Sequence, residues 1–128
     1  INIWYSALQT PEDYFFLGVG AGGNSEYLVP IYAEHDWDKF TERQYNAHNQ
    51  YIGELIDLGI FAAIFFILIW LLYPLWFKGR LRQFASLVVL TIALNMLTEN
   101  MLDRIEGVII TCVILVTTAL LARDQLAK

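Results

Sequence analysis

The chain has 128 residues, of which 57% are hydrophobic and only 16% are charged, and its mean hydropathy is +0.47. Soluble domains carry about 25% charged residues, so this composition favours a membrane protein with at most one domain. Nine acidic residues against two basic ones in residues 1–57 account for the net charge of −5. An acidic segment repels phosphate backbones, and no basic stripe accompanies the aromatic residues, so we expect no nucleic-acid partner.

The chain starts at Ile1 and has no basic segment ahead of an apolar stretch, which indicates that it carries no signal peptide. We interpret it as part of a longer polytopic membrane protein. Cys112 is its single cysteine and lies in an apolar run, so the sequence excludes an internal disulfide and a cysteine-cluster metal site.

Residues 1–51 are polar but rich in aromatic side chains, which need something to pack against. We therefore predict an extracytoplasmic loop region with short helices rather than a disordered linker. Residues 1–8 read as the end of a helix, and Thr10 and Pro11 offer an N-cap and a first-turn proline. A further short helix is expected around residues 36–46.

Three glycines, Gly18, Gly20 and Gly23, match the spacing of the dinucleotide-binding fingerprint, with Tyr14 to Leu17 as a candidate preceding strand. The context does not fit, because we expect no usable helix before Pro30 and no second strand. Two interpretations stay open. The glycines form a tight turn that folds the chain back against the membrane surface, or a backbone nest that offers N–H groups to an anion.

An acidic segment with two histidines resembles a divalent metal site, since it combines Glu34, His35, Asp36 and Asp38 with the later His48. The spacing matches no strong metal motif. We favour an exposed acidic turn and expect neither a metal ion nor another cofactor.

Three apolar runs follow, the first of them 20 uncharged residues from Leu58 to Phe77. At about 1.5 Å per residue this run crosses a bilayer core of roughly 30 Å. The expected spans are about 55–77, 82–99 and 106–123, within a transmembrane region of residues 52–128. The sequence thus predicts an all-α integral membrane protein with about three transmembrane helices. A soluble helical hairpin is the alternative, but little charge is left to solvate its outer face.

The loop between the first two runs, residues 78–82, holds three bases and no acid. The positive-inside rule places this loop in the cytoplasm, and residues 1–51 on the outer side. Trp70, Tyr73 and Trp76 gather near the cytoplasmic end of the first span, as interfacial aromatics do. Pro74 is expected to kink or end that helix.

His48 and Asn49 stand where the polar segment meets the first span. In one interpretation Asn49 or Asn46 caps the helix and His48 is merely interfacial. In the other, His48 is a proton acceptor beside a helix end that favours a bound phosphate. Spacing alone favours the cap.

The outer connection, residues 98–107, carries several charges near the membrane. If it is helical, Glu99, Asp103 and Glu106 share one face, with Arg104 beside them. Such groups are costly near lipid unless paired or wet, so they are candidates for function. Structural pairing between Arg104 and a carboxylate is an equal alternative.

These motifs together resemble the C-terminal part of the bacterial O-antigen ligase and O-antigen polymerase superfamily. The resemblance is carried by Trp4, Pro11, Gly18-x-Gly20, His48-Asn49-x-Tyr51-Ile52, Asp57-x-Gly59 and the stretch from Leu97 to Arg104 followed by Gly107. Two features depart from the family pattern. Asp57 stands where the family commonly has Glu, and the family's upstream arginines would precede Ile1.

The resemblance implies a metal-independent glycosyltransferase in the bacterial inner membrane, with residues 1–51 on the periplasmic side. It would transfer or polymerise a glycan from undecaprenyl diphosphate onto a glycan or lipid-linked acceptor, surrounded by membrane lipids. His48 would be the catalytic base. The candidate substrate-binding residues are Asn49, Arg43, Arg104, Tyr45, Tyr51, Gly18, Gly20 and Glu99. An isolated chain without the upstream arginines is expected to be inactive. The alternative is a non-catalytic part of a polytopic transporter or membrane scaffold.

Reporter fusions test the predicted orientation. A fusion at Gly79 should report the cytoplasm, and a fusion near Asp38 should report the outer side, because the basic loop is retained inside. Alkaline phosphatase and fluorescent reporters measure this directly. The reverse pattern would remove the enzyme interpretation, since lipid-linked glycans would then lie on the other side from His48.

Overall fold

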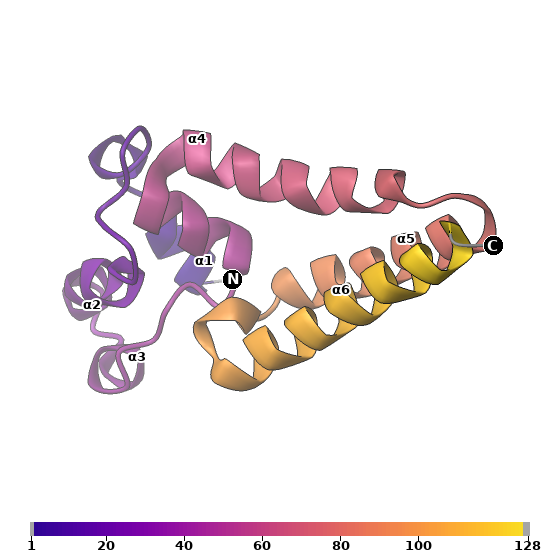
Figure 1. Cartoon of the computed structure of the whole chain (residues 1–128). Coiled ribbons are helices and arrows are strands. Elements are labelled where there is room, and N and C mark those ends of the chain that lie inside the picture. Colours follow the sequence, from indigo (N-terminus) through magenta and orange to yellow (C-terminus); the bar gives the residue numbers. More distant parts are fainter. Residues whose placement is uncertain (1, 127–128) are drawn as a thin grey trace.

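The computed structural model describes residues 2–126, and this part of the chain is helical and contains no strand (Figure 1). The α-helices are α1 (Asn2–Ala7), α2 (Asn24–Glu34), α3 (Asp38–Glu42), α4 (Gln50–Leu72), α5 (Gly79–Met96) and α6 (Ile105–Leu126). Short 3-10 turns η1 (Pro11–Asp13), η2 (Tyr73–Trp76) and η3 (Met101–Asp103) lie between them. The predicted all-α class is confirmed.

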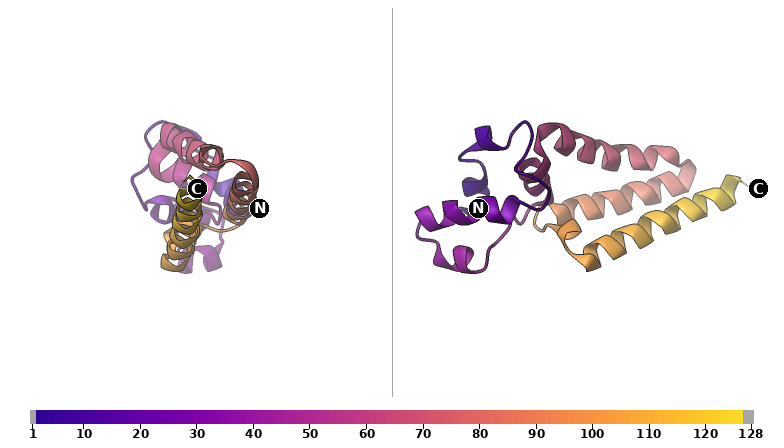
Figure 2. Two further views of the ribbon diagram at one scale, coloured as in Figure 1. Left: turned by 45° about the vertical axis from the view of Figure 1, so that its right-hand side comes forward. Right: turned by 60° about the vertical axis from the view of Figure 1, so that its left-hand side comes forward.

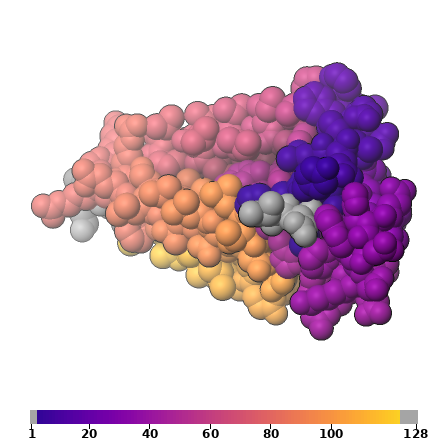
Figure 3. Space-filling view, turned by 180° about the vertical axis from the view of Figure 1, so that it is seen from behind, coloured from indigo at the N-terminus to yellow at the C-terminus, as the bar shows by residue number. Residues whose placement is uncertain are grey.

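The three long helices run side by side, and the short helices gather at one end of them (Figures 1 and 2). Helix α4 contacts α5, and α5 contacts α6, so successive helices form an up-and-down array. The turn from α4 to α5 lies at the far end, near the end of α6 (Figure 1). The space-filling view from behind shows the N-terminal residues gathered at one end and the later residues forming the rest of the molecule (Figure 3).

Two of the long helices are apolar and long enough to cross a membrane: residues Gln50–Trp76 and Ile105–Ala122. Two of the predicted spans are thereby supported by helix length and composition. Helix α5 carries Arg80 and Arg82 in its first turn and is not among the helices that are long and apolar enough to cross a membrane. The count of three spans therefore stays a prediction. Large apolar side chains cover the outside of the bundle, and Phe61 is 71% exposed. Such a surface suits lipid or further membrane helices.

Helix α4 ends close to Pro74, as the sequence predicts. The helix stops at Leu72, and Pro74 lies in the 3-10 turn that comes next. Because proline has no N–H to donate to the preceding turn, the chain leaves the α-helix at this point and turns toward α5.

The short N-terminal elements share a core with the first turns of α4. Its buried members are Ala7, Tyr14, Leu28, Tyr32, Ala47 and Ile56. The Tyr14 hydroxyl donates a hydrogen bond to the carbonyl of Ala7, and burial raises the pKa of Tyr14 to about 12. Since Ile56 belongs to α4, this core fixes the short helices to the start of the long bundle.

Predicted and observed short helices differ in detail. The helix expected at residues 1–8 is confirmed as α1, whereas the one expected at 36–46 is only α3. Thr10 makes no side-chain cap, and its hydroxyl instead hydrogen-bonds the Tyr27 hydroxyl. The hydroxyl therefore ties η1 to α2 rather than starting a helix.

The expectation that no usable helix precedes Pro30 is wrong. Helix α2 starts directly after the glycines and runs for 11 residues with Pro30 inside it. Packing of Leu28 and Tyr32 in the core offsets the one hydrogen bond that the proline removes. The candidate strand at residues 14–17 is a turn. No strand occurs among residues 2–126, so no dinucleotide-binding βαβ unit is present there.

Helix α4 is broken in its first half. Gly59 has φ 78° and ψ 179°, which separates residues 50–58 from the apolar residues 60–72. Only glycine adopts this backbone conformation without strain. The break leaves backbone carbonyls and N–H groups of α4 without their helical partners.

The glycine-rich turn supplies the missing partners. The backbone hydrogen bonds are Val19 N–H to Ile56 O (2.8 Å), Gly20 N–H to Asp57 O (2.9 Å) and Ile60 N–H to Phe15 O (2.7 Å). Close approach requires glycine on both sides of the contact. A Cβ on Gly18 would lie 2.2 Å from the Asp57 carbonyl oxygen, and one on Gly59 would lie 2.4 Å from the Phe16 carbonyl oxygen. The folded-back turn expected for these glycines is thus observed, with α4 as its partner.

A pair of glycine variants separates backbone conformation from this close contact. Gly59 and Gly22 both have positive φ, but a Cβ on Gly22 meets nothing within 4 Å. Gly22→Ala should cost about 1 kcal/mol of stability, and Gly59→Ala more than about 3 kcal/mol because a backbone clash is added. Thermal unfolding of the purified protein in detergent measures both. Equal losses would show that the contact contributes nothing.

Candidate functional site

His48 lies in the turn before α4, at the boundary between the short helices and the long bundle. Its backbone is left-handed, with φ 46°, and its side chain is 31% exposed. The Tyr45 ring packs edge-on against the imidazole, with 5.1 Å between ring centroids. His48 Nδ1 lies 3.5 Å from a carboxylate oxygen of Glu99. A half-exposed imidazole is therefore held between an aromatic ring and a carboxylate.

The same carboxylate oxygen of Glu99 lies 3.5 Å from Nη2 of Arg104. The pairing of Arg104 with a carboxylate is therefore observed. The shared helical face of Glu99, Asp103 and Glu106 is not formed, because the connection has only one 3-10 turn before α6 begins at Ile105. Glu99 and Arg104 are both at least half exposed, so water screens the pair and it contributes little to stability.

Asn49 is the N-cap of α4. Its side-chain oxygen accepts the N–H groups of Tyr51 and Ile52, and its amide group donates to the Leu97 carbonyl at 3.1 Å. The residue is buried. The capping interpretation is confirmed, and the polar atoms of Asn49 are engaged in holding the turn rather than facing open space.

A buried amide on the opposite connection completes the support of this turn. The Asn49 N–H donates to Asn100 Oδ1 at 2.7 Å, and the Asn100 amide group donates to Asp103 Oδ2 at 2.9 Å. Asn46 donates to the same carboxylate oxygen at 3.1 Å, and Gln50 donates to Asp103 Oδ1 at 3.4 Å. This network fixes the position of the His48 turn relative to the α5–α6 connection. Sequence reasoning missed Asn100, because an asparagine in a loop carries no spacing signal.

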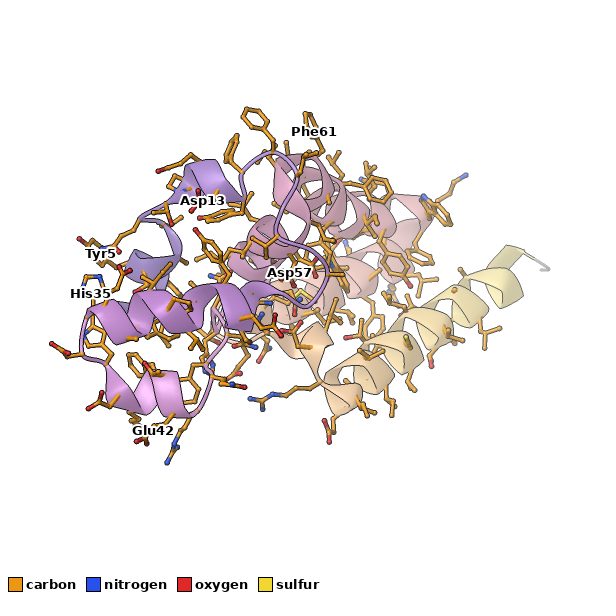
Figure 4. The ribbon with its side chains drawn as sticks, turned by 90° about the vertical axis from the view of Figure 1, so that its left-hand side faces the viewer. Tyr5, Asp13, His35, Glu42, Asp57 and Phe61 are labelled. Atoms are coloured by element: carbon orange, nitrogen blue, oxygen red, sulfur yellow. The ribbon has the colours of Figure 1, made fainter. Side chains whose placement is uncertain are left out.

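Asp57 forms a second buried anchor, next to the helix break. Its carboxylate accepts the Asn24 backbone N–H at 2.7 Å and the Asn24 side-chain amide at 2.9 Å, which joins the start of α2 to α4 (Figure 4). Gly53 lies between this anchor and the Asn100 network, and a Cβ there would lie 2.6 Å from the Asn100 amide nitrogen. The glycine turn and the start of α2 therefore face an anion that belongs to the protein itself, the carboxylate of Asp57.

The structure brings together some of the predicted site residues and separates others. Arg43 is exposed and its Nη1 donates to the Tyr45 hydroxyl at 3.3 Å, so Arg43 and Tyr45 extend the His48 surface. Tyr51 instead donates its hydroxyl to the Ala93 carbonyl and ties α4 to α5. Gly18 and Gly20 contact Asp57 at the helix break. The group around His48 thus comprises Tyr45, Arg43, Glu99 and Arg104.

The acidic segment does not assemble into a metal site. Among the described residues, no three His, Cys, Asp or Glu side chains are placed to hold a metal ion. His35 stacks on Trp37 with 4.9 Å between centroids, and its Nε2 hydrogen-bonds Gln9. Tyr5 also lies near His35, and both lie away from Asp57 and Phe61 of α4 in the view of Figure 4. The segment is the exposed turn between α2 and α3.

No family model, curated protein or solved structure matches this chain. The site is therefore defined by its own geometry.

Two substitutions of Asn49 test its role as the anchor of the turn. Asn49→Ala removes the acceptor of two N–H groups and should lower the stability by about 1–2 kcal/mol. Asn49→Ser keeps a capping oxygen and should lose less than half as much. Thermal unfolding in detergent compares them, and equal losses would indicate that the amide contact to Leu97, rather than the cap, stabilises this turn.

Proposed function

We propose that this chain is the C-terminal half of a membrane glycosyltransferase that transfers or polymerises an undecaprenyl-diphosphate-linked glycan onto an acceptor sugar. The observation that carries the proposal is the placement of His48 against Glu99 at the head of an apolar helix. A carboxylate beside one imidazole nitrogen orients the ring and leaves the other nitrogen to accept a proton. The motif resemblance supplies the class of reaction.

The proposal places the chain in the bacterial inner membrane, with the short helices on the periplasmic side. Its support is the distribution of charge over the fold. The acidic segment forms one end of the bundle, and the basic loop of residues 78–82 lies at the opposite end (Figure 1). This is the arrangement that the positive-inside rule favours. A lipid-linked donor would then present its diphosphate at the level of His48.

In the proposed reaction His48 takes a proton from the acceptor hydroxyl while that oxygen attacks the anomeric carbon. The bond from this carbon to the diphosphate breaks, and undecaprenyl diphosphate leaves with the electron pair. With Glu99 beside Nδ1, the imidazole is expected to use Nε2 as the base. No metal takes part in this scheme.

Charge on the leaving diphosphate needs cationic partners. Arg43 and Arg104 are exposed and flank the His48 surface through Tyr45 and Glu99. Guanidinium groups bind phosphate oxygens in a bidentate manner and stabilise the charge that develops there. Tyr45 is partly buried beside His48, and its aromatic ring is suited to contact with a sugar. These roles supplement the upstream arginines that the resemblance expects.

A non-catalytic role in a transporter or membrane scaffold is the second candidate. It is favoured by the complete engagement of Asn49 as a helix cap and by the pairing of Arg104 with Glu99. Both features stabilise the turn without any substrate.

Substitution of His48 separates these two functions. In the intact protein, His48→Ala should lower glycan transfer by about 10²- to 10⁴-fold, the usual contribution of a general base. His35→Ala is the matched control, because it removes the other histidine of the chain from the α2–α3 turn. Transfer of radiolabelled glycan in membranes measures activity, and immunoblots confirm equal expression.

A further variant tests the carboxylate. Glu99→Gln should lower the turnover number with little change in the Michaelis constant for the acceptor, because it weakens orientation of the base rather than binding.

Full transfer by His48→Ala would contradict the catalytic role and favour the scaffold.

A further inference from the structure

An apolar groove runs along the seam between α5 and α6, away from the His48 turn. It consists of adjoining hollows of 240, 280 and 290 Å³, all of which touch Phe84. Val88 and Ile114 line two of them, so these two hollows lie next to each other. The lining is apolar apart from threonines and one arginine, Arg80, at the end of the groove.

The groove has the length of one membrane leaflet. From Arg80 to Ile92, its limits on α5, a helix rises about 18 Å, and half of a bilayer core of roughly 30 Å is about 15 Å. The two helices lie side by side on the face shown in Figure 3. An extended hydrocarbon chain would therefore reach from the headgroup level to the middle of the bilayer within this groove.

One end of the groove carries positive charge. Lys78, Arg80 and Arg82 are the only charged residues between Leu58 and Thr98. The hollow at this end is lined by Arg80, Leu81, Phe84 and Leu121.

We propose that this groove binds one anionic phospholipid, with an acyl chain along the α5–α6 seam and the phosphate on Arg80. The occupant follows from charge complementarity, because a basic side chain at the mouth of an apolar groove favours an acidic headgroup over a zwitterionic one. A further protein helix would instead bury Arg80 against apolar side chains, which is costly without an acidic partner. The inference rests on α6 as a candidate membrane helix and on the predicted span of α5, and it does not depend on glycan transfer.

Native mass spectrometry of the intact protein in detergent tests the site. The protein is titrated with phosphatidylglycerol and, separately, with phosphatidylcholine. The wild type should retain phosphatidylglycerol preferentially at one copy per chain. Arg80→Gln should weaken phosphatidylglycerol binding about fivefold, the usual contribution of one basic residue at a membrane surface, and should abolish the preference.

Two matched controls locate the site. Arg82→Gln removes the same charge, but Arg82 lines none of the three hollows, so binding should stay at the wild-type level. Leu121→Trp fills the groove and should lower retention of both lipids, whereas Leu120→Trp, at a neighbouring exposed position outside the groove, should not. Equal losses for Arg80→Gln and Arg82→Gln, equal binding of the two lipids by the wild type, or no effect of Leu121→Trp would each overturn the proposal.

Discussion

The break of α4 at Gly59 is the constraint on which the rest of the structure depends. It separates residues 50–58, which pack against the short N-terminal helices, from the apolar residues 60–72. The glycine turn fills the break through backbone hydrogen bonds, and Asp57 fixes the start of α2 beside it. A polar break in a membrane helix is tolerated when its freed backbone groups find partners inside the protein. Here those partners come from residues 15–20, which explains why glycines occur on both sides of the contact.

The His48 turn takes its position from this arrangement. Asn49 caps the first segment of α4, and Asn100 holds the turn to the α5–α6 connection. His48 itself sits in a left-handed conformation between two anchored residues, with Glu99 reaching it from the other connection. A non-glycine residue in this conformation is retained when its surroundings fix it, and such strain is common at functional sites. The fold thus holds an imidazole at the start of the apolar helix α4, where the short helices meet the long ones (Figure 1).

Sequence patterns predicted the features that depend on local chemistry. The apolar runs indicated long helices, Pro74 ended the first of them, and Asn49 proved to be a cap because capping needs only the next few N–H groups. Features that depend on contacts distant in sequence were not predicted. The break at Gly59 requires residues 15–20, α2 is stabilised around Pro30 by its core packing, and Asn100 acts across 51 residues on Asn49. The pairing of His48 with Glu99 is likewise a contact between two connections, which spacing does not reveal.

The central claim is that the surface around His48 receives a lipid-linked diphosphate. The most direct measurement is a cryo-EM structure of the intact protein in a lipid nanodisc with undecaprenyl diphosphate bound. Diphosphate density is expected beside the His48 imidazole, contacted by guanidinium groups that include Arg43 or Arg104. Density bound at the opposite end of the helices, or on a face that His48 does not reach, would contradict it.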